Sequence, residues 1–176
     1  MNRKYLTSKD LAVCGLFAAV TAVLTQISLP LGAVPFSLGI LGAMLTGVAL
    51  EPKLAFFSQL CFLLLGAVGA PVFTQFQGGP QKLLGPTGGY LLGYLVMAPV
   101  ISLLCGPVGF RFGRAFAAAV CGVLCCYVFG TAWLAFSTGI GVKAAILTGA
   151  LPFLPLDVVK AALAAVVGPR LRKRLQ

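Results

Sequence analysis

The chain contains no histidine, and only three of its 176 residues are acidic. Charged residues of either sign make up 9% of the sequence, whereas soluble domains contain about a quarter. The missing histidine excludes Ser-His and Cys-His catalytic pairs, and no G-x-x-x-x-G-K-[ST] motif is present to bind a nucleotide. We therefore predict that the chain is not an enzyme, does not hydrolyse ATP, and holds neither a cofactor nor a metal.

Apolar residues dominate what remains. Hydrophobic residues make up 60% of the chain, and the mean hydropathy is +1.04. A soluble fold of this size could not bury so much apolar surface. The apolar runs are continuous rather than alternating and are rich in glycine and alanine, which favours helices over a β-barrel. The six cysteines also lie in these runs, where we interpret them as small buried hydrophobic side chains. The sequence predicts an all-α integral membrane protein.

Prolines, glycines and charged residues divide the chain into six apolar segments, which we expect to form one membrane domain over 1–176. The predicted spans are 9–29, 37–50, 53–68, 88–104, 115–136 and 155–167. The second is short for a spanning helix, which needs about 20 residues. Pro30 is predicted to end the first helix and Pro169 the sixth. The connection 137–151 has room for a short helix across the end of the bundle.

Basic residues gather on one side of this predicted topology. Ten of the thirteen lie at the termini or in two short connections: Arg3, Lys4, Lys9, Lys53, Arg111, Arg114, Arg170, Arg172, Lys173 and Arg174. The positive-inside rule places this side in the cytoplasm, so both termini are predicted to be inside. The loops 30–37, 72–86 and 137–151 then lie outside. The net charge of +10 reflects this distribution, and we expect no nucleic-acid partner.

Asp157 is the only acid within hydrophobic sequence, and Lys160 follows it by three residues. Positions i and i+3 share one face of a helix. A charge at the bilayer centre costs about 2.5–3.5 kcal/mol on insertion scales, and such charges are usually functional. Two interpretations stay open from the residues alone. The pair either holds the last helix in place or binds a polar ligand in the outer half of the bundle.

Further candidate binding residues lie on the same outer side. The loop 30–37 is uncharged and is either a candidate lid or a loop that rests on lipid headgroups, and the loop 72–86 is the most polar long loop. The glycines that begin the fourth span allow a ligand or another backbone to approach closely. The candidates are Phe36, Ser37, Phe73, Gln75, Gln77, Lys82, Thr87, Gly88, Gly89 and Tyr90.

The first span carries two pairs of small residues at helical spacing, Gly15 with Ala19 and Ala18 with Ala22. Such pairs give a helix a smooth face that a second helix can approach closely. The spacing fits internal packing and docking to a partner subunit equally well.

Three segments of the chain resemble the BioY family, and the resemblance covers nearly the whole chain in order and spacing. They are Val34-Pro35-Phe36-Ser37, Gly85-Pro86-Thr87-Gly88-Gly89-Tyr90-Leu91-Leu92-Gly93-Tyr94, and Pro152-Phe153-Leu154-Pro155-Leu156-Asp157-Val158-Val159-Lys160. The chain departs from the family pattern after the Pro-Phe pair, where Ser37-Leu38-Gly39 replaces the usual Thr-Leu-Gln. This departure falls in the candidate lid.

The resemblance implies a six-helix S component of an energy-coupling factor (ECF) transporter in a prokaryotic cell membrane. Such a subunit captures extracellular biotin with high affinity, and two partner ATPases and a transmembrane coupling protein then drive uptake. The family's biotin contacts correspond to Asp157 and Lys160, and its coupling surface to Ala18 and Ala22 on the first helix. The alternatives are an S component for another vitamin and a stand-alone secondary transporter of a small polar solute.

Overall fold

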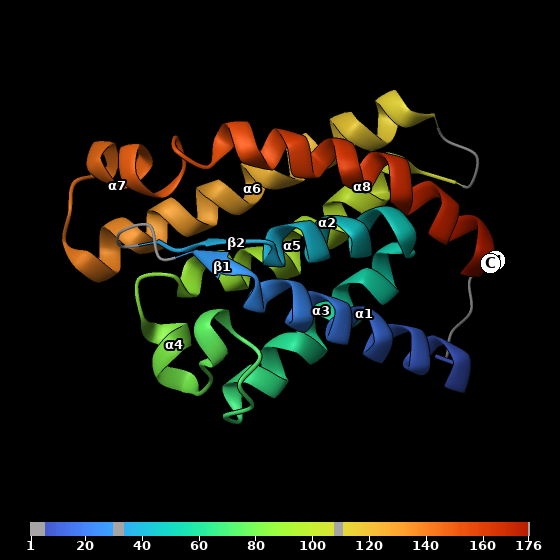
Figure 1. Ribbon diagram of the computed structural model, residues 1–176, viewed down its shortest axis with the longest axis horizontal. Coiled ribbons are helices and arrows are strands. Elements are labelled where there is room, and N and C mark those ends of the chain that lie inside the picture. Colours follow the sequence, from blue (N-terminus) through green and yellow to red (C-terminus); the bar gives the residue numbers. More distant parts are fainter. Residues whose placement is uncertain (1–5, 30–33, 108–110, 176) are drawn as a thin grey trace.

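The computed structural model describes residues 6–29, 34–107 and 111–175, which are almost entirely helical (Figure 1). The central helices of the bundle are α2 (Gly39–Ala49) and α5 (Gly88–Cys105). One side is formed by α1 (Ser8–Gln26) and α3 (Pro52–Ala67), and the other by α6 (Phe112–Thr138) and α8 (Leu154–Leu175). Nearly every residue of α2 is buried, so this helix forms the centre of the core. The predicted all-helical membrane fold is confirmed.

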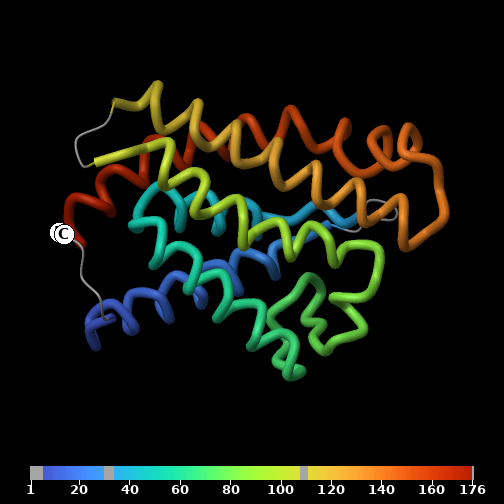
Figure 2. Tube along the Cα trace, turned by 180° about the vertical axis from the view of Figure 1, so that it is seen from behind, coloured from blue at the N-terminus to red at the C-terminus, as the bar shows by residue number. Residues whose placement is uncertain are grey.

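Short elements gather at the end of the bundle opposite the C-terminus (Figure 2). They are the 3-10 turn η1 (Thr74–Phe76), α4 (Pro80–Leu84), α7 (Val142–Gly149) and the strands β1 (Ser28–Leu29) and β2 (Phe36–Ser37). The helix α7 lies within the connection where a short helix was expected. The two strands pair antiparallel, Ser28 with Ser37 and Leu29 with Phe36. This hairpin was not predicted, because strands of two residues are too short to show an alternating pattern.

Among the described residues, three helices are long and apolar enough to cross a membrane: α1, α5 and α6. The pair α7 and α8, bent by 54° at their break, satisfies the same criterion together. The helices α2 and α3 are apolar but shorter, with 11 and 16 residues. A helix rises about 1.5 Å per residue, so α2 is too short to cross the hydrocarbon core in helical form.

Both described ends of the chain lie at one end of the bundle (Figure 2). There the Lys9 ammonium donates a hydrogen bond to the Leu175 carbonyl at 3.0 Å. The basic residues that begin α3 and α6 and end α8 lie at this same end, whereas Lys82 in α4 and Lys143 in α7 lie at the other. The positive-inside rule assigns the basic end to the cytoplasm. Arg3 and Lys4 lie outside the described residues.

Helices occupy all six predicted segments, but several boundaries differ from the prediction: α6 begins three residues earlier than expected, and the ends of α1 and α8 also differ. The helix α1 ends at Gln26 because Ser28 and Leu29 pair with β2, and Pro30 lies outside the described residues. The predicted end of the last helix was wrong, because α8 continues through Pro169 to Leu175.

Tertiary packing explains why α8 continues. A proline within a helix removes one hydrogen bond and costs about 3 kcal/mol. Here Gly168 packs closely against Val48, and the Arg172 guanidinium lies 3.5 Å from the Val48 carbonyl oxygen. Leu171 and Leu175 also pack against a small hydrophobic cluster at the cytoplasmic end. These contacts offset the local cost of the proline.

A buried side-chain amide on α3 joins this helix to α1 and α2. The fully buried Gln59 donates from Nε2 to Thr21 Oγ1 at 3.2 Å and to Thr46 Oγ1 at 3.0 Å. The two threonine hydroxyls in turn donate to carbonyls one turn earlier in α1 and α2. Both amide hydrogens of Gln59 are therefore used between helices, where hydrocarbon offers no replacement.

Gln59→Ala is expected to destabilise the protein by about 2 kcal/mol, because it removes two interhelical hydrogen bonds and leaves a cavity. Unfolding in mixed micelles measures the change in free energy. The matched control is Gln77→Ala, since the Gln77 side chain is exposed and a surface change of this kind shifts stability by less than about 0.5 kcal/mol. Equal effects of the two substitutions would contradict this role for Gln59.

Candidate functional site

A pocket of about 390 Å³ lies near the outer end of the bundle, between β2, α2, α5, α6 and the start of α8. Five of the residues proposed from the sequence line it: Phe36, Ser37, Tyr90, Asp157 and Lys160. The rest of the wall is largely aromatic and aliphatic and includes Tyr94, Tyr127, Ile40 and Phe153. The structure therefore brings residues 34–37 of the candidate lid and the acid–base pair to one place, although they are more than 100 residues apart, and the rest of that loop lies outside the described residues.

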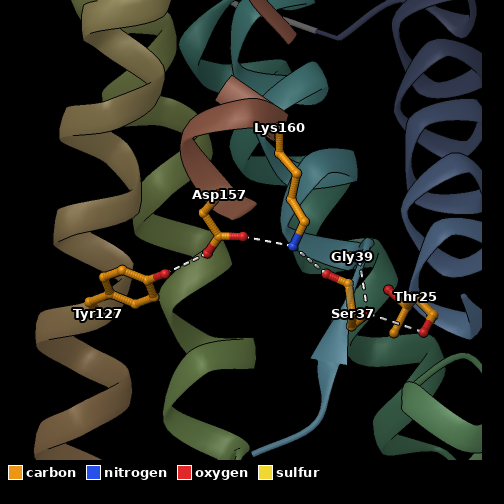
Figure 3. A network of polar contacts seen from close by, with 6 residues as sticks. All are labelled: Thr25, Ser37, Gly39, Tyr127, Asp157 and Lys160. Atoms are coloured by element: carbon orange, nitrogen blue, oxygen red, sulfur yellow. Dashed lines mark hydrogen bonds and ion pairs between the residues drawn. The ribbon is translucent and has the colours of Figure 1, made fainter. Parts of the chain in front are cut away.

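Asp157 and Lys160 form an ion pair in the pocket wall (Figure 3). The Lys160 ammonium donates to Asp157 Oδ1 at 2.7 Å, and both residues are less than 5% exposed. Local sequence places them, because Asp157 lies in the first turn of α8, where the helix dipole favours a negative charge. Lys160 follows one turn later on the same face, as predicted from the spacing.

Lys160 also fixes the segment that carries Phe36 and Ser37. Its ammonium donates to the Ser37 carbonyl oxygen at 2.8 Å and lies 4.0 Å from the centroid of the Phe36 ring, at cation–π distance. The Ser37 hydroxyl donates to the Thr25 carbonyl at 3.2 Å and accepts from the Gly39 amide at 3.0 Å. The polar network thus runs from α8 through the start of α2 to α1 (Figure 3).

Tyr127 completes the network from α6 and was not among the predicted site residues. Its hydroxyl donates to Asp157 Oδ2 at 2.6 Å, so each carboxylate oxygen accepts a hydrogen bond from the chain. One sequence signal was available, because a buried tyrosine hydroxyl within a spanning helix needs a hydrogen-bond partner. The sequence does not show that this partner lies 30 residues away.

Tyr90 has a different partner. Its hydroxyl donates to the Gly149 carbonyl at 2.9 Å and so ties α5 to the end of α7. Its ring packs closely over Gly130 of α6. Tyr90 therefore shapes the pocket, while its hydroxyl donates to the backbone rather than to the ion pair.

The adjacent glycines do not line the pocket. Gly88 packs against the backbone of Leu83, and Gly89 against Trp133 and the Phe129 carbonyl. A side chain at Gly89 would collide with α6, so this glycine allows close approach of two helices rather than of a ligand. Thr87 precedes α5 as its N-cap and is half-buried.

The structure does not bring the polar-loop candidates into the pocket either. Phe73 is fully buried and packs edge-to-face on Phe62, with ring centroids 5.5 Å apart. Gln75 and Gln77 are exposed, and Lys82 is half-buried in α4, where burial lowers the pKa of its ammonium group. Gln26 was not predicted to act on this loop, but its amide oxygen accepts from the Phe76 amide and its amide nitrogen donates to the Pro71 carbonyl. Gln26 thereby fastens this loop to α1.

The two small-residue pairs of α1 lie in different surroundings. Ala18 is 1% exposed and Ala22 is half-buried against the core, so this pair serves internal packing. Gly15 and Ala19 are exposed. The burial of Ala18 favours internal packing, and the place of Ala18 and Ala22 on a partner-facing surface stays a prediction.

The fold and the pocket together define a helical membrane protein with a pocket near one end of its bundle. The model of the BioY family matches residues 1–176. The chain belongs to the BioY family.

Relatives from an archaeon and a bacterium support this assignment. The chain is 38% identical over 167 residues to the probable biotin transporter BioY of Pyrococcus horikoshii, covering 95% of this chain and 98% of the relative. It is 38% identical over 165 residues to the biotin transporter BioY of Thermotoga maritima, covering 94% and 96%. A crystal structure of the S-component for biotin from an ECF-type ABC transporter superimposes with a TM-score of 0.85. That structure shares 30% identity, and the superposition covers 96% of this chain and 95% of the other.

Proposed function

We propose that the chain captures biotin at the outer face of a prokaryotic cell membrane, as the S component of an ECF-type transporter. The observation that carries this proposal is the buried Asp157–Lys160 pair in the wall of an otherwise apolar pocket. Family membership and the similarity to a biotin S-component supply the ligand.

The chemistry of the pocket suits biotin. The ureido ring of biotin offers two N–H donors and a carbonyl acceptor, and the Asp157 carboxylate accepts from such donors. The Lys160 ammonium has three hydrogens, of which Asp157 and Ser37 take two, so one remains for a carbonyl or carboxylate of the ligand. Phe36 and Tyr90 provide apolar surface for the sulfur-containing ring. Specific affinity in pockets of this kind comes from a few placed polar groups within apolar walls.

Transport requires partners, because the sequence contains no nucleotide-binding motif. We expect a transmembrane coupling protein and two ATPases to supply the energy of uptake. Gly15 and Ala19 offer a smooth, exposed face on α1 for the coupling protein.

Isothermal titration of the purified protein in detergent tests the ligand directly. A nanomolar dissociation constant for biotin, equivalent to about 12 kcal/mol, is expected. Absence of biotin binding combined with copurification of the ATPases would indicate an S component for another vitamin. Uptake into proteoliposomes without ATP or partners would indicate a secondary transporter. Mass spectrometry of the small molecule that copurifies with the protein separates these outcomes.

A further inference from the structure

The Asp157 carboxylate is held from two sides. Lys160, on the same helix, donates to Oδ1 at 2.7 Å, and Tyr127, on α6, donates to Oδ2 at 2.6 Å. Two hydrogen bonds to different oxygens fix both the position of the carboxylate and the plane in which its remaining lone pairs lie. Short bonds to an ionised acceptor are among the strongest in proteins.

Tyr127 itself is firmly placed. It is 7% exposed within a helix of 27 residues, and its carbonyl accepts a hydrogen bond from the Thr131 hydroxyl at 2.7 Å. Because α6 and α8 are separate helices, the Tyr127–Asp157 bond sets the carboxylate relative to the rest of the pocket. The bond to Lys160 cannot do so alone, since both of its residues move together with α8.

The two residues joined by this bond also line a second space. An apolar groove of about 320 Å³ between α6 and α8 is lined by Tyr127, Asp157 and five aliphatic residues. Tyr127 and Asp157 therefore border both the groove and the ligand pocket.

We propose that Tyr127 is a positioning residue that holds the Asp157 carboxylate in the orientation required by the N–H donors of the ligand. The inference rests on the proposed function, because it assumes that the ligand contacts Asp157. Tyr127 acts on affinity through Asp157, whereas Tyr90 lines the same pocket but donates to Gly149.

A double-mutant cycle separates these roles. Tyr127→Phe removes only the hydroxyl and is expected to weaken biotin binding about tenfold, the usual effect of losing a hydrogen bond to a charged group. In an Asp157→Asn background, Tyr127→Phe should reduce the affinity for biotin by less than about threefold, because the effects of substitutions at interacting residues are not additive. The matched control is Tyr90→Phe, whose effect should be the same in both backgrounds. Titration calorimetry with biotin measures all six proteins, the wild type included.

The outcomes are distinguishable. If the wild type fails to bind biotin, the proposed function is wrong. If the wild type binds and Tyr127→Phe binds equally well, or loses the same factor in both backgrounds, the role of Tyr127 is wrong. If Tyr127→Phe does not fold, the test becomes the folding of the double variant. If Asp157→Asn restores folding, the inference is supported, because this change removes the carboxylate that was left with only one donor. If folding is not restored, the inference is contradicted.

Discussion

Asp157→Asn is expected to weaken biotin binding by at least about thirtyfold, since breaking one partner of a buried hydrogen-bonded charge pair costs about 2–5 kcal/mol. The asparagine has nearly the same shape, so the pocket keeps its form. The amide is uncharged and keeps only one acceptor oxygen, so its NH₂ group presents donors in place of one of the two oxygens that accept from Lys160 and Tyr127. Titration calorimetry in detergent measures the loss, and the thermal unfolding of the ligand-free protein shows that the fold persists.

Two further variants sharpen this test. Lys160→Ala removes the pair from its other side and also leaves the Ser37 carbonyl without its donor, so an equally large loss is expected. The control is Asp10→Asn, the same chemical change at the cytoplasmic end, where Asp10 caps α1 through Thr7. It should leave the affinity unchanged. Unaltered affinity in both Asp157→Asn and Lys160→Ala would contradict the assignment of the site.

The parts of the site that were predictable depend on short-range patterns. Helix locations follow from apolar runs. The placement of Asp157 and Lys160 on the same helix face follows from a spacing of three residues. The motif that resembles the BioY family then supplied the ligand, which spacing cannot do. Phe36 and Ser37 joined the pair in the prediction because the topology placed their loop on the same side and because they lie in a segment that resembles the family.

The parts that were missed depend on contacts between distant segments. Tyr127 reaches Asp157 across 30 residues, and Gln59 joins α1 and α2 from α3. No local pattern specifies such partners. The glycines before Tyr90 are ambiguous in another way. Their small size indicates that something packs closely against them, but not whether it is a ligand or another helix. The structure identifies this neighbour as a helix for Gly89.

The small residues of α1 show the same ambiguity, and the structure resolves it. Gly15-x-x-x-Ala19 is exposed, whereas Ala18-x-x-x-Ala22 faces the core. A helix uses small residues on a face only where another helix must come close. Internal packing accounts for the second pair. The first pair has no such neighbour among the described residues, as nothing lies within 4 Å of a side chain built at Gly15.

Ala19→Trp is therefore expected to reduce ATP-driven biotin uptake to the level of empty vesicles while leaving biotin affinity unchanged. The bulky ring projects from α1 into the surrounding bilayer, where it disturbs no internal contact but keeps a partner helix at a distance. Proteoliposomes that contain the coupling protein and the ATPases of the same organism measure uptake, and copurification measures assembly.

Two tryptophan controls separate docking from folding. Leu163→Trp places the same ring on the exposed face of α8, on the opposite side of the bundle, and should permit normal uptake. Ala18→Trp forces the ring into a fully packed core and should impair folding and biotin binding together. Normal uptake by Ala19→Trp would show that the coupling protein docks elsewhere, and a loss confined to Leu163→Trp would point to α8. Affinity and uptake are measured separately. The capture of biotin in the pocket and its delivery through a partner at α1 are therefore tested as two distinct functions.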